Sequence, residues 1–189
     1  MKILFLIFAL LSFAVSTKAD EIVHTLNTPF ALTDWDLDSS IPKFNPSNGV
    51  LTKVEIKLAT SFTNMIALEN RHASAGGNHV SRHNNFVVLE MPVIQSVTNA
   101  IFNVHTNVLS KYDGVTDFNG SSGITLKSSY VLSTVTSPTN LVDFIGADAI
   151  TVKVLGKADA SCFQNLGVIS FAASSLSSSL VTVTYTYTP

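Results

Sequence analysis

The chain has 189 residues, of which 46% are hydrophobic and 13% are charged, and its formal net charge is −2. This near-neutral balance argues against a nucleic-acid partner, because such partners need a basic patch. A single cysteine, Cys162, excludes a disulfide scaffold and any paired-cysteine zinc or redox motif. We expect it to be a small buried hydrophobe, with an intermolecular pair or a reactive thiol as the alternatives.

The N-terminus has the pattern of a secretory signal peptide. Lys2 precedes an apolar run over 3–15, and Thr17-Lys18-Ala19 offers a small-residue cleavage site. The run falls short of the ~20 residues that cross a bilayer, so no stable membrane span is expected after cleavage, and an uncleaved anchor is the alternative. We predict a signal peptide over 1–19, one mature domain over 20–189, and a secreted, extracellular or periplasmic location.

Alternation of apolar and polar residues dominates the mature chain. Within 52–58, Val54, Ile56 and Leu58 fall on one face, and 181–188 alternates in the same way. Further strands are expected near 21–26, 61–68, 85–90, 97–105, 124–135, 149–155 and 166–172, with Gly-containing turns between them. The pattern predicts an all-β antiparallel sandwich, either jelly-roll or Ig-like.

Two segments depart from this alternation. Pro138 and Gly146 bracket a predicted short helix near 138–145, which we expect to pack as a structural plug. The serine-rich stretch 172–179 reads as a flexible loop. That loop would free the uncharged strand 180–188 to pair with a second copy, which predicts possible self-association.

Three motifs in order resemble choice-of-anchor E domains. They are FNPSNGVLTKV at 44–54, LVDFIG at 141–146 and VTVTYTYTP at 181–189. The resemblance implies a secreted, β-rich bacterial protein without an established activity, and it supplies no catalytic residues. Members carry C-terminal sorting or anchoring signals, and none follows the last motif here, so a freely secreted product is expected. The motif at 44–54 is also explained by folding alone, with Phe44 in the core and a turn behind it.

The most polar stretch, 70–85, contains His72, His79 and His83. Neutral imidazoles are common ligands of zinc or copper, which makes these three weak candidates for a metal site. Gly76-Gly77 and the neighbouring asparagines favour a polar loop between strands as the alternative.

An acidic triplet, Asp34, Asp36 and Asp38, suggests calcium, because hard cations prefer carboxylate oxygens. The EF-hand pattern fails, since Ser39 and Asn45 occupy the positions that need Gly and Glu. The alternative is an edge strand or loop whose aspartates face water while the residues between them pack.

Aromatic residues beside polar ones can hold carbohydrate, so Trp35 and Tyr112 are weak ligand candidates. Asn119-Gly120-Ser121 matches the N-glycosylation pattern, although Asn-Gly also serves a turn. The sequence contains no Gly-x-Ser-x-Gly elbow and no phosphate-binding loop. We therefore expect no catalytic residues and no firm cofactor.

The leading hypothesis is a non-enzymatic structural or adhesive protein of the cell surface or matrix. Its partners would be further copies of itself, extracellular glycans or matrix. A carbohydrate- or calcium-binding module is the alternative, and a secreted hydrolase is a third.

Overall fold

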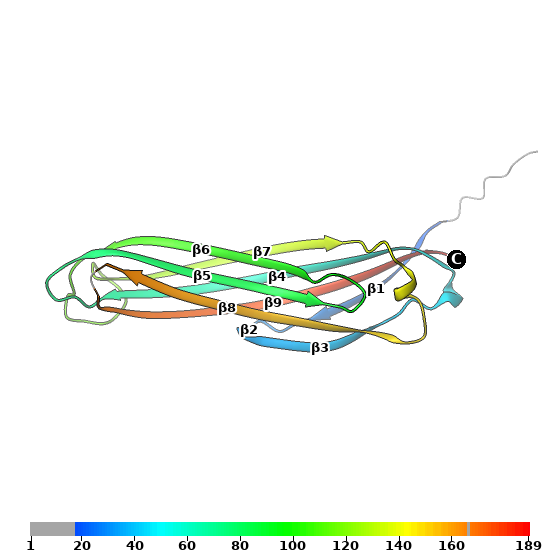
Figure 1. Ribbon diagram of the computed structural model, residues 1–189, viewed down its shortest axis with the longest axis horizontal. Helices are drawn as coiled ribbons and strands as arrows, with labels where there is room; N and C mark the ends of the chain where they lie inside the picture. The colour runs from blue at the N-terminus through cyan, green and yellow to red at the C-terminus, as the bar shows by residue number, and fades with distance from the viewer. Residues whose placement is uncertain (1–17, 166) are drawn as a thin grey trace, which may run out of the picture.

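The computed structural model describes residues 18–165 and 167–189, and it forms a sandwich of two antiparallel sheets. Most of the expected signal peptide lies outside the described residues, as does Leu166 of the strand expected over 166–172. All long strands run along the long axis of the molecule (Figure 1). The predicted all-β sandwich is confirmed.

The first sheet has the order β1-β9-β4-β7, with the short β2 also paired to β9. Its strands are β1 (Asp20–Asn27), β2 (Ala31–Leu32), β4 (Val50–Asn70), β7 (Gly123–Thr136) and β9 (Ile169–Thr188). The second sheet has the order β3-β8-β5-β6. Its strands are β3 (Trp35–Pro42), β5 (Gly77–Glu90), β6 (Val97–Leu109) and β8 (Ala149–Gln164).

The pairing of strands identifies the sandwich as a jelly roll. β1 pairs with β9, β3 with β8, β4 with β7 and β5 with β6, so the chain behaves as one long hairpin rolled into two sheets. The pairs β4–β9 and β5–β8 then join these ladders into the two sheets, each with four long strands. Eight strands arranged in this way constitute the jelly roll rather than the Ig-like alternative.

The two ends of the sandwich differ. The proximal end holds the C-terminus and the start of β1, and the distal end holds the β4–β5, β6–β7 and β8–β9 loops (Figure 1). We call the half of the interior nearest the termini the proximal half and the other the distal half. The proximal half is a hydrophobic core whose buried members include Ile41, Phe44, Val54, Ile56, Leu58, Val87, Leu89, Phe144, Ile150, Val152, Val154, Val181, Val183 and Tyr185.

Aromatic side chains close the proximal end. Phe44 and Phe144 both contact Tyr185 edge-to-face, with ring centroids 6.2 and 6.4 Å away. The Tyr185 hydroxyl donates to the Pro42 carbonyl at 3.0 Å, and burial raises the pKa of Tyr185 to about 12. Phe44 thus enters the core as expected, and behind it the 3-10 turn η1 (Pro46–Asn48) leads into β4.

The short helix expected near 138–145 is a single 3-10 turn, η2 (Val142–Phe144). The chain does not continue as a helix after this turn, because the backbone groups of Phe144 and Gly146 form hydrogen bonds with Phe44 instead. The Phe144 carbonyl accepts from the Phe44 N–H at 2.8 Å, and the Gly146 N–H donates to the Phe44 carbonyl at 3.1 Å. This bridge returns the chain to an extended conformation after one turn.

The distal half of the interior is polar. Its buried polar residues include Asn64, Asn70, His79, Ser81, His83, Asn85, Ser175 and Ser177. Thr60 and Asn99 lie at the boundary with the proximal half, where Asn99 donates to the Leu58 carbonyl at 2.9 Å, and Glu69 is buried on the outer face of β4 beneath the β6–β7 loop. A smaller apolar cluster of Ile66, Leu68 and Leu109 also lies in the distal half, and Cys162 packs against it. Burial raises the pKa of the half-buried Cys162 thiol.

Two loop predictions are wrong, because strands with polar side chains on their inner face lack the usual alternation of apolar and polar residues. Residues 77–85 of the expected polar loop belong to β5, and their inward side chains include His79, His83 and Asn85. The serine-rich stretch 172–179 belongs to β9. Since the C-terminal part of β9 is held between β1 and β4, releasing 180–188 would break two ladders, so this route to self-association is not favoured.

Among residues 18–165 and 167–189, no helix has the length and apolarity needed to cross a membrane.

Candidate functional site

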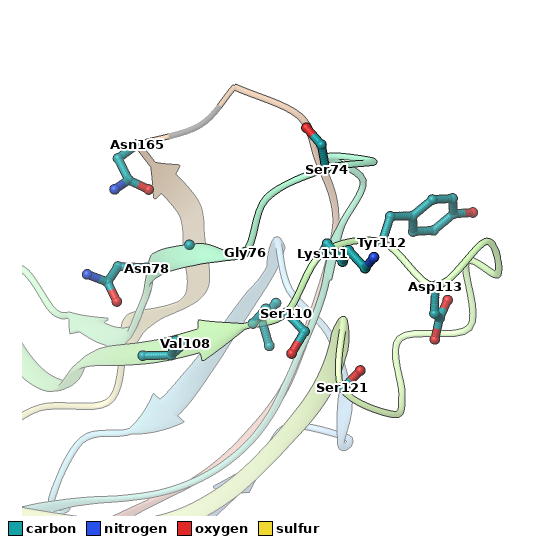
Figure 2. A pocket seen from close by; sticks show the side chains of 12 residues that line it. Ser74, Gly76, Asn78, Val108, Ser110, Lys111, Tyr112, Asp113, Ser121 and Asn165 are labelled. Atoms are coloured by element: carbon teal, nitrogen blue, oxygen red, sulfur yellow. The ribbon is translucent and has the colours of Figure 1, made fainter.

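A cleft of about 780 Å³ lies at the distal end of the sandwich (Figure 2). It is formed where the β4–β5 loop, the end of β6 and the β6–β7 loop meet. Its lining residues are Ser74, Gly76, Gly77, Asn78, Val108, Leu109, Ser110, Lys111, Tyr112, Asp113, Ser121 and Asn165. Its volume is in the range of small-molecule sites.

Local hydrogen bonds fix the walls of this distal cleft. The Asn70 amide donates to the Ser110 carbonyl at 2.7 Å and to the Ala75 carbonyl at 3.0 Å, which ties the two loops together. Gly76 lies close to β6, since a Cβ there would stand 2.7 Å from the Leu109 carbonyl oxygen. The loops therefore meet closely enough to form one cleft.

Amide and hydroxyl groups dominate the cleft. Figure 2 shows Asn78 and Asn165 on one side and Ser110 and Ser121 on the other. Such groups both donate and accept hydrogen bonds, so they suit a neutral ligand with many hydroxyl groups. Apart from Tyr112, sequence reasoning did not single out these residues; the Gly76-Gly77 and Asp113-Gly114 turns were the available signals.

The two aromatic candidates lie apart. The Tyr112 ring points away from Asn78 and Asn165 in Figure 2, and the Arg71 guanidinium lies 5.5 Å from its centroid. Trp35, on β3, packs against the proximal core, and its Nε1 donates to the Ser177 hydroxyl at 3.0 Å. The structure does not bring Trp35 and Tyr112 together as one sugar-stacking platform.

The three histidine candidates also lie apart. His72 remains in the β4–β5 loop, where its Nδ1 accepts from the Ala75 N–H at 3.1 Å. His79 and His83 lie on the inner face of β5, four residues apart. Four residues of strand span about 13 Å, too far for both rings to bind one ion.

The aspartates Asp34, Asp36 and Asp38 are exposed, and Asp36 and Asp38 alternate with half-buried residues of the edge strand β3. Asp34 accepts from the Ala158 N–H at 3.2 Å. In the part of the chain that the structure describes, no three His, Cys, Asp or Glu side chains come together as a metal-ligand group.

A second cleft, of about 340 Å³, opens on the flank between β8 and β9 and reaches His83, Asp159 and Ser175. These are the residue types of a nucleophilic triad, but Ser175 donates to Asn64 and Asn85 rather than to His83. Burial lowers the pKa of His83, with a smaller upward effect from Asp159 and a downward one from His105. The required hydrogen bond between nucleophile and base is therefore missing among these described side chains.

No family model and no curated protein matches the chain. Among solved structures, the VP2 subviral particle of infectious bursal disease virus is 14% identical with a TM-score of 0.21, and the alignment covers 89% of this chain and 38% of that chain. A structure of the Gx strain of the same virus is 12% identical with a TM-score of 0.23, covering 89% and 36%. The chain thus spans well under half the length of these structures, and likeness at this level supports no functional argument.

Proposed function

We propose that this chain is a secreted, non-enzymatic protein of the cell surface or extracellular matrix, and that it acts structurally by adhering to further copies of itself. Secretion rests on the signal-peptide pattern over 1–19 and on the resemblance to choice-of-anchor E domains. The adhesive part rests on one observation, which is an exposed apolar surface on the outer face of the second sheet.

This surface, the apolar strip, consists of Val80 on β5, Phe102, Val104 and Val108 on β6, and Phe163 on β8. Phe102 is 72% exposed, Val104 63%, Val108 78% and Phe163 57%. Val80 is paired with Phe163 on β8 and with Thr106 on β6, so it lies diagonally beside Val104 and Val108 and joins apolar side chains of three strands. Contiguous apolar surface of this kind marks interaction sites, whereas isolated exposed apolar residues do not.

The apolar strip is large enough to form the centre of an interface with a second copy of the chain. Phe102 to Val108 span about 20 Å at about 3.4 Å per residue, and three strands are about 15 Å wide, which gives about 300 Å². The polar remainder of this sheet face would supply the rest of the ~800 Å² that each partner contributes to a standard interface. Sheets readily pack face to face through such surfaces.

The charges beside the strip also suit self-pairing. Arg82 and Asp159 lie on the adjacent strands β5 and β8, two residues out of register, and the Arg82 guanidinium lies 5.4 Å from the Phe163 ring. In a two-fold interface each surface meets its own copy. Opposite charges on one face can then pair across the axis, which supports a symmetric dimer or larger assembly.

Light scattering on residues 20–189 over a range of concentrations tests the proposal. We expect concentration-dependent association that Val108→Lys weakens at least tenfold, because a buried lysine charge opposes the interface. Val131→Lys is the matched control, since Val131 is also 78% exposed but lies on β7 of the other sheet. A wild-type chain that stays monomeric, or equal effects of the two variants, would overturn the proposal.

The distal cleft favours a second candidate, a carbohydrate-binding module. Its amide and hydroxyl lining suits sugar hydroxyl groups. Binding to an array of extracellular glycans that is lost in Asn78→Ala but kept in Val104→Lys, a change in the apolar strip outside the cleft lining, would support it. Absence of glycan binding in the wild-type chain would reject it.

A further inference from the structure

The dipeptide Asn-Gly occurs twice in the chain, as Asn48-Gly49 and as Asn119-Gly120. In such a pair the glycine nitrogen can attack Cγ of the asparagine side chain, because glycine has no Cβ to obstruct the approach. An N–Cγ bond forms, the bond from Cγ to the side-chain nitrogen breaks, and that nitrogen leaves as ammonia with the proton of the glycine N–H. Water then opens the resulting succinimide ring to aspartate or isoaspartate. The surroundings of each pair decide whether it can react.

The first pair is held in the 3-10 turn η1. The Gly49 N–H donates to the Pro46 carbonyl at 3.3 Å, so the attacking nitrogen is already bonded. Gly49 has a φ of 136° and lies against the last strand, where a Cβ would overlap the Thr188 carbonyl oxygen. Ring formation would have to break the hydrogen bond and move Gly49 away from β9. We therefore expect the fold to suppress the reaction at Asn48.

The second pair lies in the β6–β7 loop, and both of its residues are exposed. Among the described residues, neither the Gly120 N–H nor the side-chain amide of Asn119 has a hydrogen-bond partner, and the Asn119 N–H donates to the Asp117 carboxylate at 3.0 Å. A Cβ on Gly120 would approach only the Asp113 carboxylate, at 3.5 Å. The attacking nitrogen and the amide that it attacks are thus both free to move together.

The residues on either side of this second pair are anchored. The Phe118 N–H donates to the buried Glu69 carboxylate at 2.8 Å. The Ser121 carbonyl accepts from the Ser110 N–H at 2.8 Å. The pair therefore forms an exposed tip between two fixed points, and a change in its backbone acts on both.

We propose that Asn119 is a site of spontaneous deamidation, which converts its side chain through a succinimide to aspartate or isoaspartate. The reaction consumes only water and releases ammonia, so it needs no enzyme. It also does not depend on the proposed self-association.

Both products should loosen the β6–β7 loop. Each adds a carboxylate to a loop that already carries Asp113 and Asp117 and covers Glu69, so like charges repel one another there. Isoaspartate also lengthens the backbone by one atom between Phe118 and Ser121. Since Ser121 lines the distal cleft, the conversion alters that cleft, and it does so once and in one direction.

Peptide mapping by mass spectrometry tests the proposal, after residues 20–189 have been incubated at mildly alkaline pH. We expect conversion at Asn119 to be at least about tenfold faster than at Asn48, because reaction at Asn48 must first break a hydrogen bond and displace packed backbone. In urea both pairs lose their surroundings, so the two rates should become similar.

Matched variants at the two pairs separate the reaction from its effect. Asn119→Gln should abolish the conversion, because the longer side chain closes a larger ring more slowly, whereas Asn48→Gln should leave conversion at Asn119 unchanged. Asn119→Asp supplies the charge of the product directly. We expect it to speed trypsin cleavage after the exposed Lys111 at least about twofold, and Asn48→Asp not to do so.

Three results would overturn the proposal. The first is a folded wild-type chain in which Asn119 does not convert or converts no faster than Asn48. The second is a ratio of rates that urea leaves unchanged, since the local sequence rather than the fold would then determine it. The third is an Asn119→Asp variant as resistant to trypsin as Asn48→Asp, which would reject the effect on the loop.

Discussion

The same strands run through the proximal and distal halves of the sandwich, but the side chains that fill the space between the sheets differ. On β4 the inner face carries Val54, Ile56 and Leu58 in the proximal half, whereas in the distal half Asn64 lies beside Ile66 and Leu68. Yet β4 stays paired with β9 without interruption from residue 53 to residue 70. The same ladder therefore forms around an aliphatic interior and around one where hydrogen-bonding side chains replace aliphatic ones.

The two halves should contribute unequally to stability. Fully burying an aliphatic side chain stabilises a fold by about 1.5–3 kcal/mol, whereas a typical hydrogen bond contributes about 1 kcal/mol net. Several distal amide and imidazole atoms lack partners among the described residues, including those of Asn64, His83 and Asn103. We therefore expect the distal half to open locally before the proximal half does.

The largest expected effect comes from truncating Phe144, the buried residue of the 3-10 turn η2. Phe144→Ala should lower the free energy of unfolding by about 3–5 kcal/mol, because Phe144 is fully buried against Tyr185. Val142→Ala, at a 73% exposed position of the same turn, should change it by less than about 0.5 kcal/mol. Urea unfolding measures both, and equal effects would contradict a packed proximal core.

A matched pair on β5 compares the halves directly. Val87 and Asn85 are both fully buried on the same face, two residues apart at the boundary. Val87→Ala should lower the free energy of unfolding by about 2 kcal/mol through lost burial, and Asn85→Ala by about 1 kcal/mol through the loss of one hydrogen bond with Ser175. The reverse order in urea unfolding would show that the polar network stabilises the fold more than the apolar core does.

The smallest expected effect is a dependence of stability on pH that arises in the distal half. Burial holds the pKa of His83 below that of an unfolded histidine, about 6.5, while Asp159 opposes this shift and His105 adds to it. As the pH falls below about 6.5, the unfolded chain binds the proton first, so this contribution to stability is complete above that pH and declines below it.

Urea unfolding between pH 8 and pH 5 measures this dependence. The slope below about pH 6.5 should shrink in His83→Leu, because the titrating group is gone. It should persist in His24→Gln, which removes a histidine that contacts Tyr185 in the proximal half. An unchanged slope in His83→Leu would assign the pH dependence to other groups.

The sequence predicted the proximal half better than the distal half. Alternation of apolar and polar residues correctly indicated strands at 52–58 and 181–188, because their inner faces are apolar. It also identified Phe44 as a core residue. The order of strands did not follow from alternation, since period two specifies faces but not partners.

Polar side chains on the inner face explain why parts of β5 and β9 were predicted as loops. At the start of β5, the inward side chains His79, Ser81 and His83 are polar while the outward Val80 is apolar, so the usual contrast is reversed. The serines of β9 hide the same alternation, because alternate residues of a uniform serine stretch look identical. Glu69 escaped notice because its burial depends on a loop more than forty residues away in the chain.

The nested pairing of the jelly roll also determines when the chain can fold. Asp20 pairs with Tyr187, and β9 lies between β1 and β4, so the first sheet has no centre until the last strand has been synthesised. Contacts between such distant parts of a chain form slowly. For a chain exported as we propose, the nascent protein therefore stays unfolded throughout synthesis and reaches its final form only after its whole length has been delivered.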